Sequence, residues 1–299
     1  MESALSKPHV VSFSGGRTSA YLVYLMEQKR KNEGWDVHYI FMDTGAEHPK
    51  TYEFVRDVAF YFDIDLVCLR LDASPPLGKG NNYEVCTVDE IGPDLKPFAG
   101  MVKKYGSPGI PSPWCTSRMK VDTHEAYCKK RFGKDNFITW LGIRADEKRR
   151  LKRKKDLSYL ADISDATKDD IIAWWKGMFF DLEIHEHLGN CVFCFKKGDG
   201  KLALAARDAP EEYERFWNMI TDPGNRIPPG KSDNAIMYRN HRSLPDVIAQ
   251  FEEFSYQEIW DSLRFTKKFD TNSCSESCEI VNFDDIPEEQ TLKYILGED

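Results

Sequence analysis

Several features that define large classes of proteins are missing from this sequence. No run approaches the roughly 20 apolar residues that cross a membrane. No signal peptide opens the chain, so we expect a cytoplasmic protein with no membrane partner. The net charge of −8 excludes a broadly basic protein, and any nucleic-acid contact therefore needs a local basic patch. No Gly-Lys-Ser/Thr follows the first glycine-bearing turn at the spacing of the Walker phosphate-binding loop, and internal repeats and a second Cys-x-x-Cys pair are also absent from the sequence.

Cysteine is present, but its context does not suggest disulfide bonds. Eight cysteines in a cytoplasmic chain of 299 residues are not expected to form a disulfide framework. Cys191 and Cys194 form the one Cys-x-x-Cys pair, which suits zinc, part of an iron–sulfur cluster, a redox dithiol or no special role. Zinc and clusters need further ligands. His185 or His187, which lie just before the pair, would complete a zinc site together with one more thiol.

The order of apolar segments predicts an α/β fold. Apolar strands alternate with amphipathic helices, which is typical of an open, doubly wound, mostly parallel sheet with helices on both faces. The expected strands lie at 9–13, 37–42, 64–71 and 137–144, with a short edge strand at 161–163. Residues 72–114 have little periodicity and many glycines and prolines, which favours a functional loop or lid.

The rest of the chain suggests a smaller, helical C-terminal part. We expect three regions in order along the chain. They are a nucleotide-binding α/β domain over 1–180, a Cys-x-x-Cys segment with a helical region over 181–270, and an acidic tail over 271–299 that carries Cys274 and Cys278.

The turn after the first strand is a candidate phosphate site. Ser14-Gly15-Gly16-Arg17-Thr18-Ser19 joins the apolar strand that ends with Ser12 and Phe13 to an amphipathic helix. Glycines let the backbone approach a ligand, and the free N–H groups of a first helical turn favour phosphate. An ordinary strand-to-helix turn is the alternative.

Polar residues follow the second strand directly. Asp43 and Thr44 stand just past its carboxyl end, where open α/β sheets bind ligands. Helix capping is the alternative for Asp43.

A basic run follows the strand at 137–144. Lys148–Lys155 contains seven basic residues of eight, which suits either a solvated segment or contact with a nucleotide or nucleic-acid backbone.

Ser14–Ser19 resembles the PP-loop of the ATP pyrophosphatases, usually Ser-Gly-Gly-x-Asp-Ser, with Thr18 in the place of Asp. The segments Pro113–Val121 and Gly142–Arg150 extend the similarity to the phosphoadenosine phosphosulfate reductase-like family, including the sulfur-incorporating enzyme of DNA phosphorothioation. The similarity covers roughly residues 8–200. It implies an adenine nucleotide alpha hydrolase-like fold that binds ATP with Mg²⁺. The implied nucleotide contacts are Ser12, Ser14, Gly15, Gly16, Arg17, Thr18, Ser19, Asp43, Thr44, Gly142, Ile143 and Arg144.

The same resemblance implies a cluster site. Cys115 lies in a segment similar to the Cys-Cys-x-x-Arg-Lys-Val of adenylyl-sulfate reductases, where Cys191 and Cys194 would supply the second part of the site. Because Thr116 replaces the second cysteine, Cys115, Cys191 and Cys194 would hold a [4Fe–4S] cluster with one open iron. Zinc is the alternative. The reductases' Glu-Cys-Gly-x-His tail is absent, which weakens a reductase assignment.

The resemblance favours an enzyme that adenylates its substrate with ATP, releases pyrophosphate and then transfers sulfur, with a nucleic acid as acceptor through Lys148–Lys155. Arg17, Lys120 and Arg144 are the candidate catalytic residues that neutralise phosphate charge; for Lys120 and Arg144, surface ion pairing is the alternative. A sulfonucleotide reductase is the second hypothesis. A non-catalytic nucleotide sensor or zinc-stabilised nucleic-acid-binding module is the third. A sulfur-donor protein and a second copy of the chain are the other candidate partners.

Overall fold

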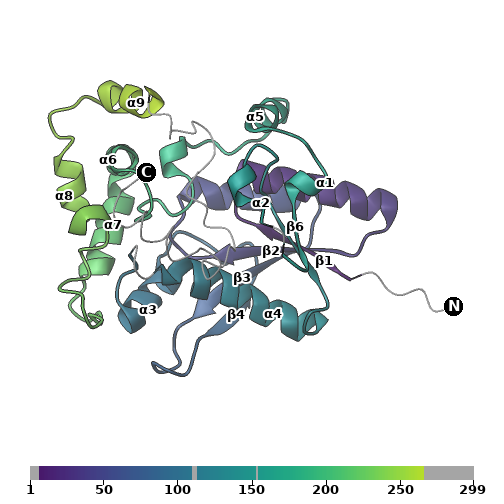
Figure 1. Ribbon diagram of the computed structural model, residues 1–299, viewed down its shortest axis with the longest axis horizontal. Helices are drawn as coiled ribbons and strands as arrows, with labels where there is room; N and C mark the ends of the chain where they lie inside the picture. The colour runs from purple at the N-terminus through teal and green to yellow at the C-terminus, as the bar shows by residue number, and fades with distance from the viewer. Residues whose placement is uncertain (1–6, 110–112, 153, 266–299) are drawn as a thin grey trace.

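The computed structural model describes residues 7–109, 113–152 and 154–265, and its centre is a six-stranded sheet (Figure 1). The strand order is β4-β3-β2-β1-β5-β6, with β4 antiparallel to β3 and every other neighbouring pair parallel. The strands are β1 (His9–Phe13), β2 (Val37–Asp43), β3 (Leu66–Asp72), β4 (Asn82–Cys86), β5 (Ile138–Leu141) and β6 (Leu157–Tyr159). The order reverses beside β1, and open α/β sheets bind ligands past the carboxyl ends of the strands at such a point.

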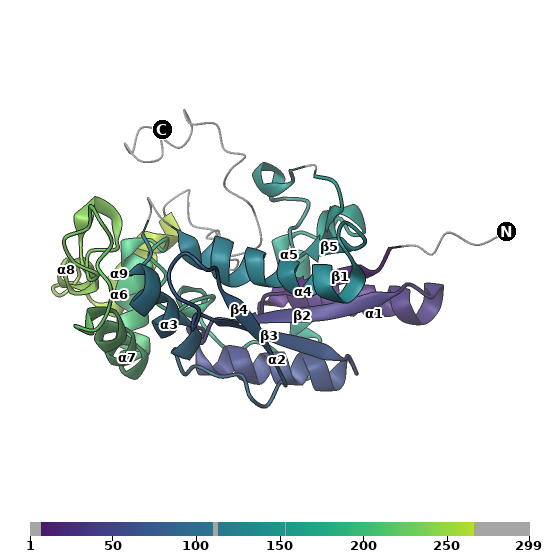
Figure 2. The ribbon, with the colours of Figure 1, turned by 90° about the horizontal axis from the view of Figure 1, so that it is seen from below.

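Helices cover both faces of this sheet. Leu22 of α1, Val55 of α2 and Trp175 of α5 belong to the core on one face, whereas Cys128 of α4 packs with Val10 on the other. Figure 2 shows α2 and α4 on opposite sides of the strands. The helices are α1 (Arg17–Glu33), α2 (Pro49–Tyr61), α3 (Lys96–Tyr105), α4 (Thr123–Phe132), α5 (Lys168–Lys176), α6 (Asp199–Asp208), α7 (Pro210–Thr221), α8 (Leu244–Ala249) and α9 (Tyr256–Phe265), with a π-helix at Cys115–Asp122 and short 3₁₀ turns at Lys148–Arg150, Leu160–Asp162, Glu186–Leu188 and Arg239–His241.

The later helices form a part of their own at one end of the molecule, drawn green to yellow in Figure 1. Their core includes Leu202 of α6, Phe216 of α7 and Val247 of α8. The same core contains Phe98 of α3 and Trp114, so it includes residues of the segment between β4 and β5. The expected open, doubly wound, mostly parallel sheet and the helical C-terminal part are both confirmed.

Two local expectations were wrong. Residues 72–114 contain β4 and α3 rather than an irregular loop throughout. β4 is a partly exposed edge strand, so its side chains lack the apolar alternation that marks a strand in the sequence. The predicted edge strand at 161–163 lies a few residues earlier in the chain, as β6. Tyr159 of β6 pairs with Leu141 of β5, and Leu160–Asp162 forms a 3₁₀ turn directly after the strand.

The remaining expectations concern the domain boundary, the acidic tail and membrane-spanning segments. The predicted boundary at 180 stays a prediction. The predicted acidic tail at 271–299, with Cys274 and Cys278, lies outside the described residues. No helix in the described ranges is both long enough and apolar enough to span a bilayer.

Candidate functional site: a phosphate loop beside a cysteine cavity

Hydrogen bonds of the Ser19 side chain stabilise the turn between β1 and α1. The Ser19 hydroxyl donates to the Gly16 carbonyl at 3.0 Å and accepts from the Ser14 backbone N–H at 3.1 Å. The Ser14 hydroxyl lies 2.9 Å from it and is left to act as the donor. Gly16 is the N-cap of α1 and offers no side-chain cap. The first N–H groups of α1 therefore keep the capacity to bind an anion such as phosphate.

Two glycines make this turn compact. Gly15 has φ +79°, and a Cβ there would come within 2.8 Å of Thr51 Cγ2 on α2. Gly142, just past β5, lies so close to α1 that a Cβ would meet the Ser19 Cα at 2.8 Å. The predicted residues of the β1 turn and of the β5 exit are thus in direct contact. Of the other predicted contacts in these segments, Ser12 is buried in β1, Thr18 is half-buried in the first turn of α1, and Ile143 is fully buried.

Arg17 is bound to the segment after α5. Its Nε and Nη2 donate to the two carboxylate oxygens of Asp181 at 2.6 and 2.9 Å, and Nη2 also donates to the Leu182 carbonyl. The indole of Trp175 donates to the Arg17 carbonyl at 3.0 Å. A phosphate contact through these N–H groups therefore requires exchange with Asp181.

Asp43 lies at the carboxyl end of β2 with its carboxylate fully bonded. Arg70 donates to Oδ2 from Nε at 3.0 Å and from Nη2 at 2.6 Å, while Tyr52 and the Gly45 N–H donate to Oδ1. Burial raises the pKa of Asp43 above its ordinary value, and Arg70 opposes that shift. Helix capping, the alternative from the sequence, is not its role, because the cap of α2 is His48. In this structure Asp43 joins the end of β2 to Arg70 on β3 and to Tyr52 on α2.

Glu47 was missed by the sequence analysis. It is 3% exposed, and its Oε2 accepts from Thr44 at 2.7 Å and from Tyr52 at 3.0 Å. Its Oε1 accepts from the Cys191 thiol at 3.7 Å and lies 3.9 Å from the Lys120 ammonium. An antiparallel bridge between Glu47 and Cys191 joins the two backbones. The sequence feature that could have indicated Glu47 is its position, because it is a second carboxylate four residues after Asp43 in the segment that follows β2.

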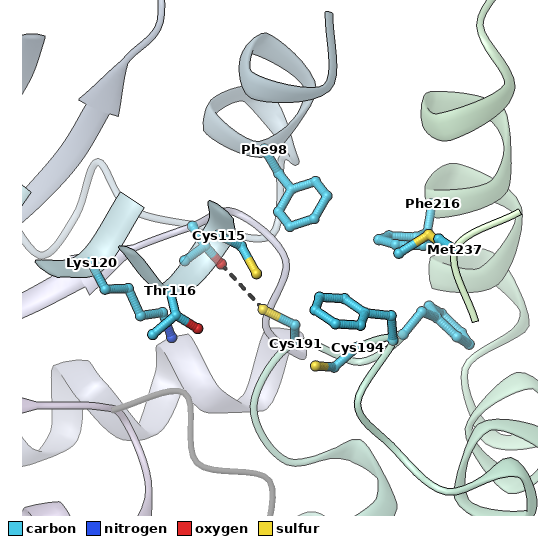
Figure 3. Close-up of a pocket in the computed structure, with 11 residues that line it drawn as sticks. Phe98, Cys115, Thr116, Lys120, Cys191, Cys194, Phe216 and Met237 are labelled. Atoms are coloured by element: carbon cyan, nitrogen blue, oxygen red, sulfur yellow. Dashed lines mark hydrogen bonds between the residues drawn. The ribbon is translucent and has the colours of Figure 1, made fainter. Parts of the chain in front are cut away.

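The three predicted cluster cysteines line one cavity (Figure 3). Cys191 and Cys194 are buried and come from the turn before α6, whereas Cys115 begins the π-helix. In a π-helix, bonds link residues five apart, which suits the placement of Cys115 and Lys120 on the cavity wall. Thr44 also lines it, 3.7 Å from the Cys191 sulfur. The other lining residues are Thr116, Phe98, Phe193, Phe195, Phe216 and Met237.

Cys115, Cys191 and Cys194 are the thiols that this cavity offers to the predicted metal groups. Within the described ranges, no group of three or more His, Cys, Asp or Glu side chains is arranged to hold a metal ion. Neither His185 nor His187 lines the cavity, and His187 is bonded to Asp208 instead. Zinc with a histidine ligand therefore has no formed site there. Three thiols on the walls of one cavity match the donor chemistry of a cluster, whose thiolates are spread around several irons. The cavity has to widen to admit one.

Arg144 is only 1% exposed and is paired within its own turn. Its Nε and Nη2 bind Asp146 at 2.8 and 3.1 Å, and its Nη1 lies 3.6 Å from Glu147. The ion-pairing alternative from the sequence describes these contacts, with the difference that the Arg144 side chain is buried rather than on the surface.

The basic run returns along the free edge of the sheet. It begins after the β5 exit, where Glu147 donates its N–H to the Arg144 carbonyl, and ends at Asp156, whose carbonyl accepts from Thr139 at the start of β5. The exposed basic residues in its described part are Lys148, Arg149, Lys152, Lys154 and Lys155. These exposed basic residues therefore lie on the connection that runs from the carboxyl end of β5 to the start of β6.

Comparisons with known proteins identify the class of this fold and site. The family model described as the phosphoadenosine phosphosulfate reductase domain matches residues 8–84, which include the β1 turn and Asp43. An uncharacterized nin region protein of Escherichia phage lambda, ORF290, is 50% identical over 275 residues, covering 91% of this chain and 94% of the phage protein. The chain belongs to the same family as this phage protein, and its phosphoadenosine phosphosulfate reductase-like assignment rests on residues 8–84.

More distant likenesses are weaker. An uncharacterized protein of Methanocaldococcus jannaschii is 28% identical over 232 residues, covering 73% of this chain and 42% of that protein. The structure of an NH₃-dependent NAD synthetase from Campylobacter jejuni, in complex with nitrate, matches at 16% identity with a TM-score of 0.36, over 75% of this chain and 89% of that one. That score is too low to support a conclusion about function.

Proposed function

We propose that this protein is an ATP-dependent sulfur-transfer enzyme. One observation carries the proposal: Cys115, Cys191 and Cys194 line a single cavity, although more than seventy residues separate the first from the other two. Thr44, at the end of β2, belongs to the same cavity. Because parallel strands place their carboxyl ends at one edge of the sheet, this cavity adjoins the crevice beyond the β1 turn.

In the proposed reaction, ATP with Mg²⁺ places its phosphates on the amides of Ser14–Ser19. Cleavage between the α- and β-phosphates adenylates the substrate and releases pyrophosphate, and a sulfur nucleophile then displaces AMP. Lys120, Arg17 and Arg144 supply positive charge against the phosphate oxygens that gain charge during transfer; Arg17 does so after leaving Asp181. Asp43, Gly142 and Ile143 shape the wall near the adenosine. A [4Fe–4S] cluster held by Cys115, Cys191 and Cys194 would supply a thiophilic metal surface for sulfur.

The cluster part of the proposal is tested by iron and acid-labile sulfide analysis of anaerobically purified protein, with its absorbance spectrum. We expect a brown protein whose iron is lost when Cys115, Cys191 or Cys194 is replaced by Ser. Cys86→Ser is the matched control, since Cys86 is partly exposed on β4 and outside the cavity. A colourless protein with stoichiometric zinc would rule out the cluster.

The family model supports a second candidate, a sulfonucleotide reductase, because its description names phosphoadenosine phosphosulfate reductase. Such an enzyme releases sulfite from adenylyl sulfate or its 3′-phosphorylated form with a thiol donor and without ATP. We expect no sulfite from either nucleotide. Sulfite release at a rate that depends on Cys191 would favour the reductase over sulfur transfer.

A nucleic acid is the proposed acceptor, with the exposed part of Lys148–Lys155 as its contact surface. We also propose that the protein is cytoplasmic, that it forms a homodimer and that it receives sulfur from a donor protein. The acceptor is identified by incubating the protein with ATP, a sulfur donor and either tRNA or duplex DNA, and by mass spectrometry of the nucleosides and of any phosphorothioate-linked dinucleotides after digestion. A sulfur-containing nucleoside or dinucleotide supports the proposal, whereas its absence from both substrates in the presence of pyrophosphate release would point to a small-molecule acceptor.

A further inference from the structure

Three aromatic side chains lie together on the surface, where α2 ends and the segment after α5 passes it. Phe60 is 78% exposed, Phe179 is 74% exposed and Tyr61 is 47% exposed. The centroid of the Tyr61 ring lies 5.1 Å from that of Phe60 and 4.6 Å from that of Phe179. These three residues form the aromatic patch. Tyr61 also packs against the half-buried Phe180, which anchors the patch to the core on this face of the sheet.

The aromatic patch is large enough to be the centre of an interface. With roughly 200 Å² for each aromatic side chain, the exposed fractions correspond to about 400 Å². The largest apolar patch on a typical monomer measures roughly 300–600 Å² and is often functional. A stable complex buries about 800 Å² on each partner, in an apolar centre surrounded by a polar rim. The residues around the aromatic patch would therefore form the rim.

The surroundings of the aromatic patch on α2 are acidic. Carboxylates lie on this helix and directly after it, at Glu53, Asp57, Asp63 and Asp65. Glu53 and Asp57 precede Phe60 by seven and three residues, which places all three on the outward face of α2. Burial raises the pKa of Asp57, and repulsion by the Glu53 carboxylate raises it further. The outward face of α2 therefore brings together like charges and ends in exposed aromatic rings.

The basic residues of these segments do not cancel this charge. Arg56 donates to the carbonyls of Val88 and Ile91, so its guanidinium is held against the segment before α3. Lys176 is exposed in the last turn of α5 and is the basic residue nearest to Phe179 in the sequence. The two segments that form the aromatic patch thus carry an excess of negative charge.

This charge distinguishes between possible occupants of the surface. A second copy related by two-fold symmetry would bring the same carboxylates into the interface again, and like charges that meet across an interface weaken binding. Nucleic acids and anionic membranes are disfavoured for the same reason. A protein with lysine or arginine side chains around an apolar centre matches both the carboxylates and the aromatic rings.

We propose that the aromatic patch and the carboxylates of α2 form a docking surface for a second protein, whose contact face is basic with an apolar centre. Thr51, near the start of α2, lies beside Gly15 of the phosphate loop, and Phe60 is about 14 Å further along the helix. Figure 2 shows α2 at the outside of the molecule, with the sheet on its inner side. The partner therefore docks without covering the crevice, and the proposal is independent of the proposed reaction.

Docking is measured with a defined probe on the full-length protein. The probe is a fluorescently labelled synthetic amphipathic helix of leucine and lysine, and a helix with glutamate in place of lysine is the charge control. Fluorescence anisotropy gives the affinity. We expect binding of the basic helix and none of the acidic one.

The test variant combines Phe60→Ser with Phe179→Ser. Its matched control combines Leu77→Ser with Phe254→Ser, whose side chains are 51% and 50% exposed at other places on the surface. We expect at least tenfold weaker binding in the test variant, because aromatic anchors dominate the binding energy of interfaces, and a change of less than twofold in the control. Glu53→Gln with Asp57→Asn should weaken binding and reduce its dependence on salt. Thermal unfolding checks that each variant folds.

Equal affinity for the basic and acidic helices would overturn the proposal, as would no binding of the basic helix or undiminished binding in the Phe60→Ser, Phe179→Ser variant. Sedimentation velocity without the probe tests the other occupant. A dimer that this variant converts to a monomer would make a second copy the occupant and would also overturn the proposal.

Discussion

Single residues determine whether the phosphate loop can form. Gly15 combines a positive φ with a close approach to α2, so two independent physical terms forbid a side chain there. Gly34, at the C-cap of α1, has a similar φ of +70° but nothing within 4 Å of the position that a Cβ would take. Substitutions at Gly34 and Gly15 therefore separate the cost of backbone strain alone from the cost of backbone strain together with a steric clash.

We expect Gly34→Ala to lower the free energy of unfolding by about 1 kcal/mol, from backbone strain alone. Gly15→Ala carries the same strain and also pushes Thr51 aside, and we expect a total of about 2–4 kcal/mol. Urea denaturation of both variants measures the difference. Equal losses would show that the contact with Thr51 is easily relieved.

A buried histidine gives a second test at this scale. Burial lowers the pKa of His124 from 6.5 to about 4, and burial likewise lowers the pKa of His187 to about 4. A histidine whose folded pKa is depressed stabilises the fold above its unfolded pKa of about 6.5, and this contribution is lost as pH falls towards 4. Each group contributes up to about 3 kcal/mol across that window.

We therefore expect the free energy of unfolding to fall between pH 6.5 and pH 4. His124→Gln should reduce that slope, while His187 retains its own contribution. The slope is the readout, because the substitution also changes packing at every pH. Denaturation at four pH values measures it, and an unchanged slope would contradict the burial of His124 as a neutral ring.

At the scale of elements, the sequence predicted regular segments better than contacts between them. The strand β2 and the polar residues after it were recognisable from apolar alternation and position. The part played by Glu47 was not, because its partners Cys191 and Lys120 are 144 and 73 residues away along the chain. Arg17 shows the same limit, since Asp181 is 164 residues from it. Local sequence patterns therefore predict helices and strands, whereas the hydrogen-bond and ion-pair partners of a side chain depend on how the whole chain packs.

The segment Lys148–Lys155 is the element with the clearest binding prediction. Replacing the exposed Lys148, Arg149 and Lys152 by Ala should weaken nucleic-acid binding. It should also reduce the slope of log affinity against log salt by roughly 2–3, about one for each lost phosphate contact. Lys79→Ala with Lys96→Ala is the control, because both side chains are exposed elsewhere. Fluorescence anisotropy at several salt concentrations measures both quantities, and equal slopes in both sets would remove this segment from the interface.

On the scale of the whole molecule, the fold brings distant parts of the chain to one end of the sheet. The doubly wound order, with β1 between β2 and β5, places the phosphate loop, Thr44 and Gly142 together. The helical part then adds the Cys191–Cys194 turn to the same end. This convergence of the three cysteines was expected from resemblance, and the structure supplies the cavity that joins them.

Nucleotide binding should stabilise the entire chain. A ligand that binds only the folded state adds about 2.7 kcal/mol at a concentration of 100 Kd, and we expect ATP with Mg²⁺ to raise Tm by several degrees. Ser19→Ala removes the hydroxyl that closes the loop and should shrink this shift, and it should also lower the Tm of the ligand-free protein by a few degrees because buried hydrogen bonds are lost. Differential scanning calorimetry measures both. An undiminished shift in Ser19→Ala would place the nucleotide elsewhere.

The most direct measurement of the central claim is the identity of the products formed from ATP. Anaerobically purified protein is incubated with ATP, Mg²⁺ and each candidate acceptor, and the nucleotides and phosphates are quantified by ³¹P NMR. The account predicts AMP and pyrophosphate in equal amounts, with loss of both in Ser19→Ala. Formation of ADP and phosphate, or no cleavage with any acceptor while sulfite is released from adenylyl sulfate, would contradict it.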